Sequence, residues 1–425
     1  MNGRDLAAWL AHAERLHPAT IDLTLDRSRA LLGALGLARL PFPVLIVGGT
    51  NGKGSCVAYL EAMLRAAGLR VGAYTSPHLV RYQERVRIDG AELAAADHAA
   101  GFAAVEAVRG GLAPTQFEFG TAAALWCLRE AAVEVAVLEV GLGGRLDAVN
   151  AVEPLASIVT SVDLDHVALL GPDREAIGRE KAGTFRAGRP AMCGDPAPPQ
   201  SLLDHAAALG APLWCLGREL IIERAAQGWS LITPGGRIEG LPAPRLAGEF
   251  QYRNAACAVA ALLACAPTLS VGPAALVAGL RQARLPARVQ RFAGPVEVVL
   301  DVAHNPAAAR ALAGELGAGS GRTHAVIGLL ADKDAAGVAA ALAPRVDAWY
   351  AVDLDGERGR SATALASVLG AAVPGRPVSC HASTAAGFAA ARSAAVAGDR
   401  IVVLGSFRVV GALLAAGLYS AEDGG

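Results

Sequence analysis

The chain has 425 residues, of which 53% are hydrophobic and 18% are charged, and its formal net charge is -1. This length exceeds what one ordinary hydrophobic core supports, so we expect two domains. Because basic and acidic residues almost balance and are mixed along the chain, the composition argues against a broad surface for nucleic acid or for an anionic membrane. An anionic substrate must therefore be met by local groups.

Cysteine usage and hydropathy indicate the compartment. The seven cysteines are scattered, with an odd total and no C-x-x-C pair, which is typical of free thiols in a reducing cytoplasm. Four charged residues interrupt the first 15, so no secretory signal is predicted. The uncharged stretch 255–280 is divided by Pro267 and Pro273 into helices too short to cross a bilayer. We expect a soluble, cytoplasmic monomer.

In the first half of the chain, apolar runs typical of strands alternate with helical patterns. The predicted strands lie at residues 43–47, 70–74, 135–140 and 156–162, and the predicted helices near residues 55–67 and 120–131. Continuous apolar runs separated by helices predict a parallel sheet with helical crossovers. We therefore predict a doubly wound α/β domain over residues 1–287. Short segments rich in Gly and Pro predict a small β-rich lobe within it, near residues 197–249.

The second half repeats the alternation. Helical character over residues 250–284 is followed by a predicted hinge at residues 285–287. Further strands are predicted at residues 296–301, 323–329, 348–352 and 400–405, with helices at 306–316, 335–343 and 362–369. These units predict a second, smaller Rossmann-like α/β domain over residues 288–425.

Residues 45–55 read L-I-V-G-G-T-N-G-K-G-S, an apolar strand that runs into a glycine-rich turn and then a helix. Glycines let backbone N–H groups converge on phosphate oxygens, the helix presents its positive dipole end, and Lys53 can reach the terminal phosphates. The standard P-loop has glycine at the position of Val47 and Ser or Thr at that of Gly54, so another residue must help to hold the metal. We predict a nucleoside triphosphate site here; a glycine-rich turn with a solvated lysine is the alternative. The predicted site comprises Thr50, Asn51, Gly52, Lys53, Gly54 and Ser55.

Polar residues follow the next strands. Ser76, in T-S-P-H-L, comes after the strand that ends at Tyr74 and could supply the hydroxyl that Gly54 lacks, because ligands sit at the carboxyl ends of parallel strands. The alternative is a helix N-cap, which Ser before Pro makes well. Glu139 ends an apolar run, where a bare carboxylate costs several kcal/mol unless a cation such as Mg²⁺ offsets it. An ion pair with a lysine or arginine is the alternative.

Two further groups of polar residues end strands. Asp163, Asp165 and His166 could orient a water or hold a metal, although a histidine satisfied only by hydrogen bonds is the alternative. In the second half, Asn254 could contact a nucleotide, Arg288 could pair with phosphate oxygens, and Asp301 with His304 could meet ribose or substrate. The alternatives are helix capping by Asn305 before Pro306 and surface pairing of Arg288.

Taken in order, these motifs resemble the folylpolyglutamate synthase/dihydrofolate synthase family, which belongs with the ATP-dependent Mur-type amino-acid ligases. The resemblance covers about residues 21–406 and rests on G-T-N-G-K-G-S, T-S-P-H-L, F-E-F-G-T, E-V-G-L-G-G-R-L-D-A-V-N, D-H-x-x-x-L-G, R-E-K-A-G, F-Q-Y-R-N-A and D-V-A-H-N-P. The segment with Asp147 looks like the bacterial bifunctional form, except that Val149 replaces a frequent threonine.

The resemblance implies a role for each matching residue. Lys53 would hold ATP phosphates, Ser76 and Glu139 would bind one magnesium, and Glu139 and His166 a second. Lys181 matches a lysine that carries a carbamate, although its charge pattern alone predicts only a surface helix residue. Positions for nucleotide or interdomain contacts are Asn254, Arg288, Asp301 and His304. Positions for substrate are His304 and Ser406 for glutamate, and Phe117, Glu118, Arg145 and Asp147 for the pterin side. Arg81 is a further position for substrate.

The implied reaction is an ATP-dependent ligation. ATP converts a carboxylate into an acyl phosphate, and the amino group of L-glutamate then attacks it. The implied acceptors are dihydropteroate, giving dihydrofolate, and reduced folates, whose γ-carboxylate is extended. Two rivals are a Mur-type ligase that acts on a cell-wall nucleotide precursor and a P-loop regulatory protein that hydrolyses ATP slowly.

Overall fold

The computed structural model describes residues 4–317, 319, 321–356 and 358–419. Within this part the chain forms two compact units. The first contains the described residues up to Asp163 together with Val167–Arg245 and Tyr252–Ala283; the second contains Leu164–His166, Leu246–Gln251 and the described residues from Arg284 onward. The boundary at residues 287 and 288 stays a prediction.

The first unit is built on an eight-stranded sheet in the order β4-β3-β2-β5-β1-β6-β7-β8. Its strands are β1 (Val44–Gly48), β2 (Val71–Tyr74), β3 (Val86–Ile88), β4 (Ala91–Glu92), β5 (Val135–Glu139), β6 (Ala156–Val159), β7 (Ala191–Cys193) and β8 (Leu213–Cys215). From β2 to β8 in this order neighbouring strands are parallel, whereas β3 and β4 add an antiparallel edge. Every residue of β1 and β5 is buried, as expected of central parallel strands.

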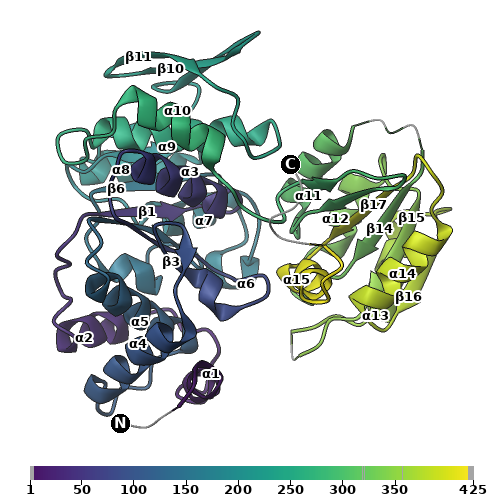
Figure 1. The fold of residues 1–425 in the computed structure, drawn as a ribbon, viewed down its shortest axis with the longest axis horizontal. Helices are drawn as coiled ribbons and strands as arrows, with labels where there is room; N and C mark the ends of the chain where they lie inside the picture. Colours follow the sequence, from purple (N-terminus) through teal and green to yellow (C-terminus); the bar gives the residue numbers. More distant parts are fainter. Residues whose placement is uncertain (1–3, 318, 320, 357, 420–425) are drawn as a thin grey trace. The chain divides into compact units, whose positions relative to one another are not determined.

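Helices cover both faces of this sheet (Figure 1). They are α1 (Leu6–Glu14), α2 (Asp26–Ala34), α3 (Lys53–Ala66), α4 (Ala95–Val108), α5 (Gln116–Glu130), α6 (Val167–Leu170), α7 (Arg174–Ala182), α8 (Gln200–Leu209), α9 (Phe250–Ala264) and α10 (Pro273–Gln282), with 3₁₀ turns η1 (Tyr82–Arg85) and η2 (Ala148–Ala151). Helices α3, α9 and α10 lie on one face, and α4 and α5 on the other (Figure 1). The predicted doubly wound α/β fold is confirmed.

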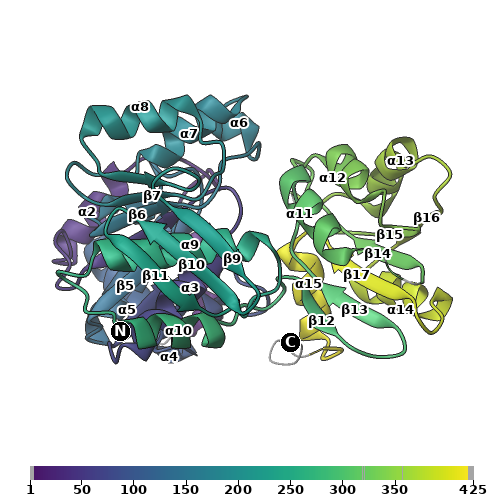
Figure 2. The same cartoon turned by 90° about the horizontal axis from the view of Figure 1, so that it is seen from above.

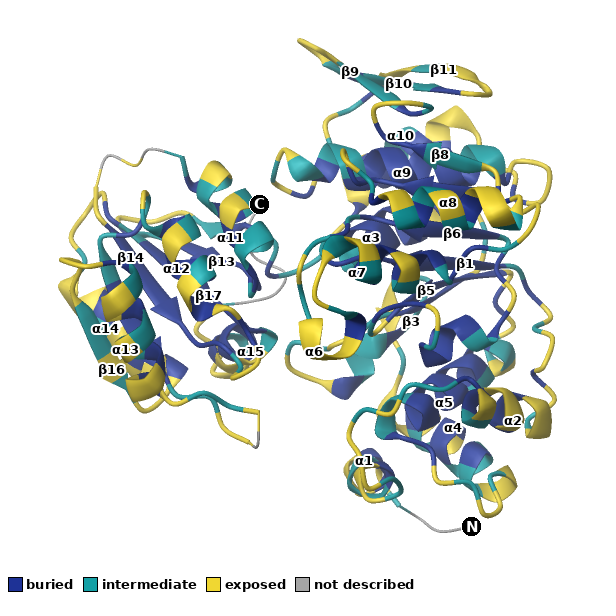
Figure 3. Cartoon of the chain, turned by 180° about the vertical axis from the view of Figure 1, so that it is seen from behind, coloured by how far each residue is buried: buried dark blue, intermediate teal, exposed yellow. Residues whose placement is uncertain are grey.

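Helix α3 is enclosed on both sides. It packs against β1, β2 and β5 on one side and against α10 on the other, and the ten residues 55–64 are all buried (Figure 3). The approach of α10 is close, since a Cβ added at Gly279 would lie 2.6 Å from the backbone N of Met63. Helix α3, which follows the predicted phosphate-binding turn, is therefore part of the core.

A separate three-stranded antiparallel sheet contains β9 (Ile221–Ala225), β10 (Gly228–Thr233) and β11 (Gly236–Leu241). It lies within the range predicted as a β-rich lobe. That range also contains helix α8, and β8, which extends the main sheet by pairing with β7. The β character is thus confined to residues 221–241 and the short β8.

The second unit contains a six-stranded sheet in the order β12-β13-β17-β14-β15-β16. Its strands are β12 (Gln290–Phe292), β13 (Glu297–Leu300), β14 (Thr323–Ile327), β15 (Ala348–Val352), β16 (Val378–His381) and β17 (Arg400–Leu404). All neighbours are parallel except β12 and β13. The helices are α11 (Pro306–Leu316), α12 (Ala335–Leu342), α13 (Ala362–Ala372), α14 (Thr384–Ala394) and α15 (Phe407–Ala415), with α11, α12 and α13 on one face of the sheet (Figure 2). The predicted second α/β fold is confirmed.

Across the described residues, none of the helices combines the length and the apolar character that a bilayer span requires.

Candidate active site

The turn between β1 and α3 has the backbone geometry of a phosphate cradle. Gly49 and Gly52 have φ values of 140° and 88°, a region that favours glycine. A Cβ at Gly49 would lie 1.9 Å from Thr160 Oγ1, and one at Gly52 would lie 2.5 Å from Asn254 Oδ1. Both positions therefore require glycine, and Asn254 of α9 is placed directly against the turn.

Hydrogen bonds fix the rest of this turn. Lys53 Nζ donates to the carbonyl oxygens of Gly49 (3.1 Å) and Thr50 (3.2 Å), so the ammonium lies over the turn. Thr50 Oγ1 donates to the Asp163 carbonyl oxygen (3.1 Å), and the Asn51 N–H donates to Ser161 Oγ (3.0 Å). Gly54 and Ser55 form the first turn of α3. The turn is held by the segment that follows β6, and the helix dipole of α3 begins at its edge.

Ser76 and Glu139 meet at the carboxyl ends of the neighbouring strands β2 and β5. The Ser76 N–H donates to Glu139 Oε2 (3.2 Å), and Glu139 is 6% exposed. No described helix begins at Pro77, since the next element is η1 at Tyr82, so the N-cap alternative for Ser76 is wrong. The ion-pair alternative for Glu139 stays open.

The donors around Glu139 suit magnesium. Mg²⁺ prefers hard oxygen ligands and is commonly held by one or two carboxylates together with substrate phosphates. Within the part of the chain that the structure describes, no group of three or more His, Cys, Asp or Glu side chains is arranged to hold a metal ion. A buried carboxylate beside a hydroxyl residue and a phosphate cradle therefore fits a metal whose remaining ligands come from a nucleotide.

Asp165 and His166 belong to the second unit, where a cluster of charged side chains surrounds them. Asp165 Oδ1 lies 2.5 Å from Lys333 Nζ, and Asp165 Oδ2 lies 3.4 Å from His304 Nε2. Burial alone would raise the pKa of Asp165, but the hydrogen bond with His304 and the charge of Lys333 outweigh it and hold this pKa well below its usual range. The aspartate is therefore a permanent anion between cationic and imidazole groups.

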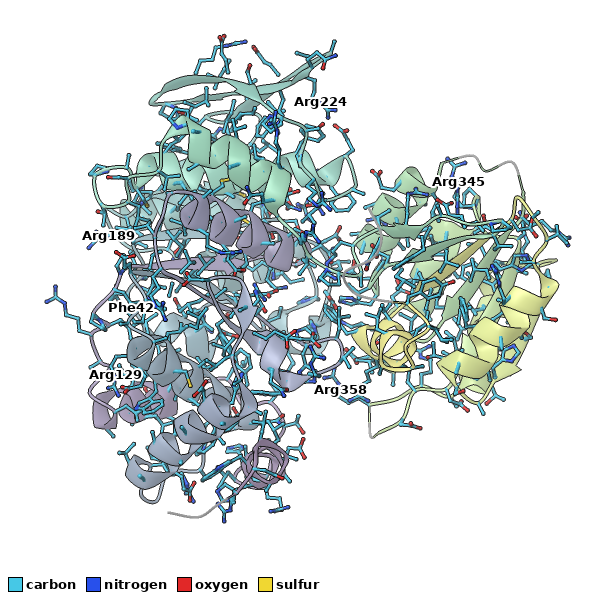
Figure 4. The ribbon with its side chains drawn as sticks, in the orientation of Figure 1. Phe42, Arg129, Arg189, Arg224, Arg345 and Arg358 are labelled. Carbon is cyan, nitrogen blue, oxygen red and sulfur yellow. The ribbon has the colours of Figure 1, made fainter. Side chains whose placement is uncertain are left out.

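His166 is held as a neutral imidazole. Burial lowers the pKa of His166 to about 4, with Asp165 opposing this shift and Lys333 reinforcing it. Neutral imidazole is the form that binds metals. Lys333 Nζ lies 3.3 Å from His166 Nε2, and the neighbouring Asp332 accepts a hydrogen bond from Arg358 (3.0 Å), which is labelled in Figure 4. Sequence reasoning missed Lys333; its signal is A-D-K-D shortly after β14.

Arg288 and Asp301 are fixed by unusual backbone in the second unit. Ala287 and Val289 both have positive φ, 58° and 49°, and Val289 is β-branched, which makes it a backbone outlier. Buried Asp301 accepts hydrogen bonds from the Val289 N–H (2.8 Å) and the Ala303 N–H (2.7 Å). Arg288 lies between the two strained residues.

His304, Asn305 and Ser406 are each held by contacts with nearby backbone atoms. His304 Nδ1 lies 2.9 Å from the Val302 carbonyl oxygen, which fixes the ring. Asn305 caps α11 by accepting from the Ala308 N–H, so the capping alternative is confirmed, and its Nδ2 also donates to Asp165 (3.3 Å). Ser406 caps α15.

The residues predicted for the pterin side lie around the loop after β5. The Phe117 ring stacks on Tyr74 at 6.2 Å, and a Cβ at Gly141 would lie 2.6 Å from it. Asp147 is buried and accepts from the N–H groups of Leu142 (2.8 Å) and Val149 (2.9 Å). Burial raises the pKa of Asp147 to about 6 despite these bonds.

Glu118, Arg145 and Arg81 have clear structural partners. Buried Glu118 forms the capping box of α5 and pairs with Arg27 (2.9 Å). Arg145 pairs with Glu180 (2.8 Å), and Arg81, which is exposed, pairs with Glu92 (3.0 Å). The substrate roles of these residues stay predictions.

Lys181 is only 3% exposed, so the surface position that its charge pattern predicts is wrong. Helix α7 packs its backbone against the loop after β5: a Cβ at Gly144 would lie 3.1 Å from the Lys181 Cα. A buried lysine is uncommon unless it is paired or chemically changed.

A P-loop α/β unit with a carboxylate at a strand end, followed by a second parallel α/β unit, defines an ATP-dependent ligase of the Mur type. Residues 287–407 match the family model described as "Mur ligase, glutamate ligase domain". The dihydrofolate synthase/folylpolyglutamate synthase of Escherichia coli is 45% identical over 408 residues, 95% of this chain and 94% of that protein.

Solved structures agree. The E. coli FolC in complex with DHPP and ADP has a TM-score of 0.92 at 44% identity and covers 97% of this chain and 98% of that one. A bifunctional folylpolyglutamate synthase/dihydrofolate synthase with Mn, AMPPNP and L-glutamate bound has a TM-score of 0.90 at 44% identity, covering 98% and 99%. The chain belongs to the dihydrofolate synthase/folylpolyglutamate synthase family, and the resemblance seen in its motifs is confirmed.

Proposed function

We propose that this ligase joins L-glutamate to 7,8-dihydropteroate, forming dihydrofolate, and to the γ-carboxylate of reduced folates that already carry glutamate. The observation that carries the proposal is the sheet order β2-β5-β1. It brings Ser76, Glu139 and the glycine-rich turn to the carboxyl ends of three adjacent strands. Similar structures bind ADP with DHPP, and AMPPNP with Mn and L-glutamate, which supports ATP and these small molecules as ligands here.

The chemistry follows from the charges of the first unit. A carboxylate does not accept an amine because its leaving group would be oxide, so the terminal phosphoryl of ATP first converts it into an acyl phosphate. The turn at residues 49–52 binds the phosphates through backbone N–H groups, and Lys53 neutralises the charge that develops on the transferred group. Magnesium, held by Ser76 and Glu139 with His166 proposed for a second ion, would neutralise phosphate oxygens. The glutamate amino group then displaces phosphate.

The second unit supplies the other contacts in this proposal. His304 and Ser406 would place glutamate, while Asn254 of the first unit, Arg288 and Asp301 would contact the nucleotide. Movement at residues 285–287 would exclude water from the acyl phosphate. We also propose a carbamate on buried Lys181, which would replace its ammonium by a carboxylate, an oxygen ligand of the kind that Mg²⁺ prefers. Phe117, Glu118, Arg145, Asp147 and Arg81 remain the proposed substrate side.

The compartment and the assembly state are also proposed. All seven cysteines are free, and six of them are buried, which supports a reducing compartment such as the cytoplasm. We also propose that the enzyme acts as a monomer.

The test is incubation of the purified protein with magnesium-ATP, L-glutamate and either dihydropteroate or tetrahydrofolate, followed by mass spectrometry of the products. Lys53→Ala and Glu139→Ala are expected to abolish glutamate-dependent ADP release, at least a 100-fold loss on the order of ~3 kcal/mol of transition-state stabilisation. Glu153→Ala, at an exposed carboxylate, is the matched control and should retain activity. Near-normal turnover by either site variant refutes the assignment.

A further inference from the structure

A buried ion pair lies beside the Ser76–Glu139 edge and has no role in the chemistry described above. Arg87 of β3 and Glu61 of α3 form it, with side chains 17% and 7% exposed. The contact is doubly hydrogen-bonded: Arg87 Nη2 and Nε donate to Glu61 Oε2 at 2.8 and 3.0 Å. Because desolvation offsets much of the attraction in a buried pair, stability alone is a weak reason for such a pair.

The remaining donors of Arg87 reach the loop that carries Ser76. Arg87 Nη1 donates to Thr75 Oγ1 (3.2 Å) and to the Glu84 carbonyl oxygen (3.3 Å). Thr75 directly precedes Ser76, whose N–H donates to Glu139. One guanidinium thus joins α3, which begins at Lys53, to the residue before the proposed magnesium hydroxyl.

Glu84 holds the other end of the loop that carries Ser76. Its carboxylate accepts three successive backbone N–H groups, those of Leu79 (2.6 Å), Val80 (2.7 Å) and Arg81 (2.6 Å). Thr75 is therefore held by Arg87 on one side, while Glu84 fixes residues 79–81 on the other. The backbone at Ser76 is left with little freedom.

Arg87 also lies within the electrostatic reach of Glu139. Burial alone would lower the pKa of Arg87, but Glu61 outweighs it and, with a smaller contribution from Glu139, raises this pKa above its usual value. The guanidinium is therefore a permanent cation in the same buried region as the carboxylate that would bind metal.

We propose that Arg87 is a positioning residue for the metal site: through Glu61 and Thr75 it holds Ser76 in the geometry in which this residue and Glu139 share one divalent cation. This inference rests on the proposed function. It goes beyond that function because the hydrogen bonds of Arg87 run to Glu61, Thr75 and the Glu84 carbonyl oxygen, so Arg87 would act through Thr75.

The test separates positioning from charge. Arg87→Lys keeps the positive charge but loses the forked contact, and Thr75→Ala removes the hydroxyl that Arg87 reaches together with the γ-methyl group. Mn²⁺ binding to the full-length protein is measured by electron paramagnetic resonance with saturating AMPPNP, and AMPPNP binding in EDTA is measured by calorimetry. Arg87→Lys is expected to raise the Mn²⁺ Kd by about tenfold, within the range for loss of an outer-shell contact, and Thr75→Ala to raise it by less.

AMPPNP affinity in EDTA should stay within about twofold of the unmodified protein, because the glycine-rich turn is unchanged. Arg109→Lys is the matched control: at the end of helix α4, Arg109 also donates through Nε and Nη2 to a carboxylate, that of Glu106, at 2.7 and 2.9 Å. Its change should leave the Mn²⁺ Kd unaltered.

Three outcomes overturn the inference. An unaltered Mn²⁺ Kd in both site variants, while the unmodified protein binds Mn²⁺, overturns it alone and leaves the proposed function standing. An equal loss in Arg109→Lys also overturns it, because the effect would then be general. Absence of Mn²⁺ binding by the unmodified protein overturns both proposals. If Arg87→Lys does not fold, Thr75→Ala decides, since the ion pair stays intact.

Discussion

Replacing Gly52 by alanine tests the link between the phosphate turn and Asn254. Gly52 has a φ of 88°, so alanine there is expected to cost roughly 1–2 kcal/mol of backbone strain. The new Cβ would also lie 2.5 Å from Asn254 Oδ1, and Asn254 is buried, so its side chain must leave its rotamer at a further ~0.5–1.5 kcal/mol. We expect Gly52→Ala to lower the free energy of unfolding by about 1.5–3.5 kcal/mol.

The chain offers a closely matched control. Gly68 has a φ of 87°, and a Cβ there would have no heavy atom within 4 Å. Gly68→Ala therefore reports the backbone strain without the steric contact. Urea denaturation of both variants, with calorimetric titration of ATP, separates the two effects: only Gly52→Ala should weaken ATP binding.

The double variant Gly52→Ala/Asn254→Ala completes a cycle. Removing the Asn254 side chain should relieve the steric part of the cost, so the second substitution at Gly52 should then cost only as much as Gly68→Ala. Equal costs for Gly52→Ala and Gly68→Ala in the unaltered background would refute the reasoning, because Asn254 would then not lie against the turn.

Two further predictions concern packing and pH. Gly279→Ala, which would place a Cβ 2.6 Å from the Met63 backbone, should lower the free energy of unfolding by about 1–3 kcal/mol. Gly314→Ala, at an exposed position of α11 with nothing within 4 Å of the new Cβ, should raise it by up to ~1 kcal/mol, and equal urea midpoints for the two variants would contradict this. For Asp147, burial raises the pKa from 3.8 to about 6, so the folded state holds a proton that the unfolded state releases, and stability of the order of 3 kcal/mol is lost as the pH rises through about 4 to 6. The Asp147→Asn variant should lack this pH-dependent loss. The difference in free energy of unfolding between the unmodified protein and the variant, measured in urea, should therefore shrink as the pH rises from about 4 to 6. A difference that stays constant over this range would show that Asp147 is not the group responsible.

Most of the fold could be predicted from local sequence patterns. Continuous apolar runs marked β1, β5 and β15, and Asn305-Pro306 marked the start of α11, because strand burial and helix capping are properties of short segments. The secondary structure of residues 197–249 was harder to predict from the sequence. Strand β8 is only three residues long and is fixed by its pairing with β7, a contact that the local sequence does not express.

The candidate site was predictable where a charge stands in an apolar run. Glu139 was singled out by the cost of burying a carboxylate, and the structure does bury it. Lys181 was not, because its burial depends on packing against Gly144, which is distant in sequence. Lys333 was missed for the same reason: its partner Asp165 is 168 residues away.

The interleaved path of the chain limits how this protein can be dissected. Segments Leu164–His166 and Leu246–Gln251 belong to the second unit although the first unit claims the residues on either side of them. A fragment cut at residue 287, where the family match begins, would lose Asp165, the anion beside His304 and Lys333. In such a fragment the buried Lys333 would lose this partner and keep only the more distant Asp332, 3.9 Å from its Nζ. Half-protein complementation or domain exchange with a relative therefore requires that the two short segments be included in the C-terminal piece.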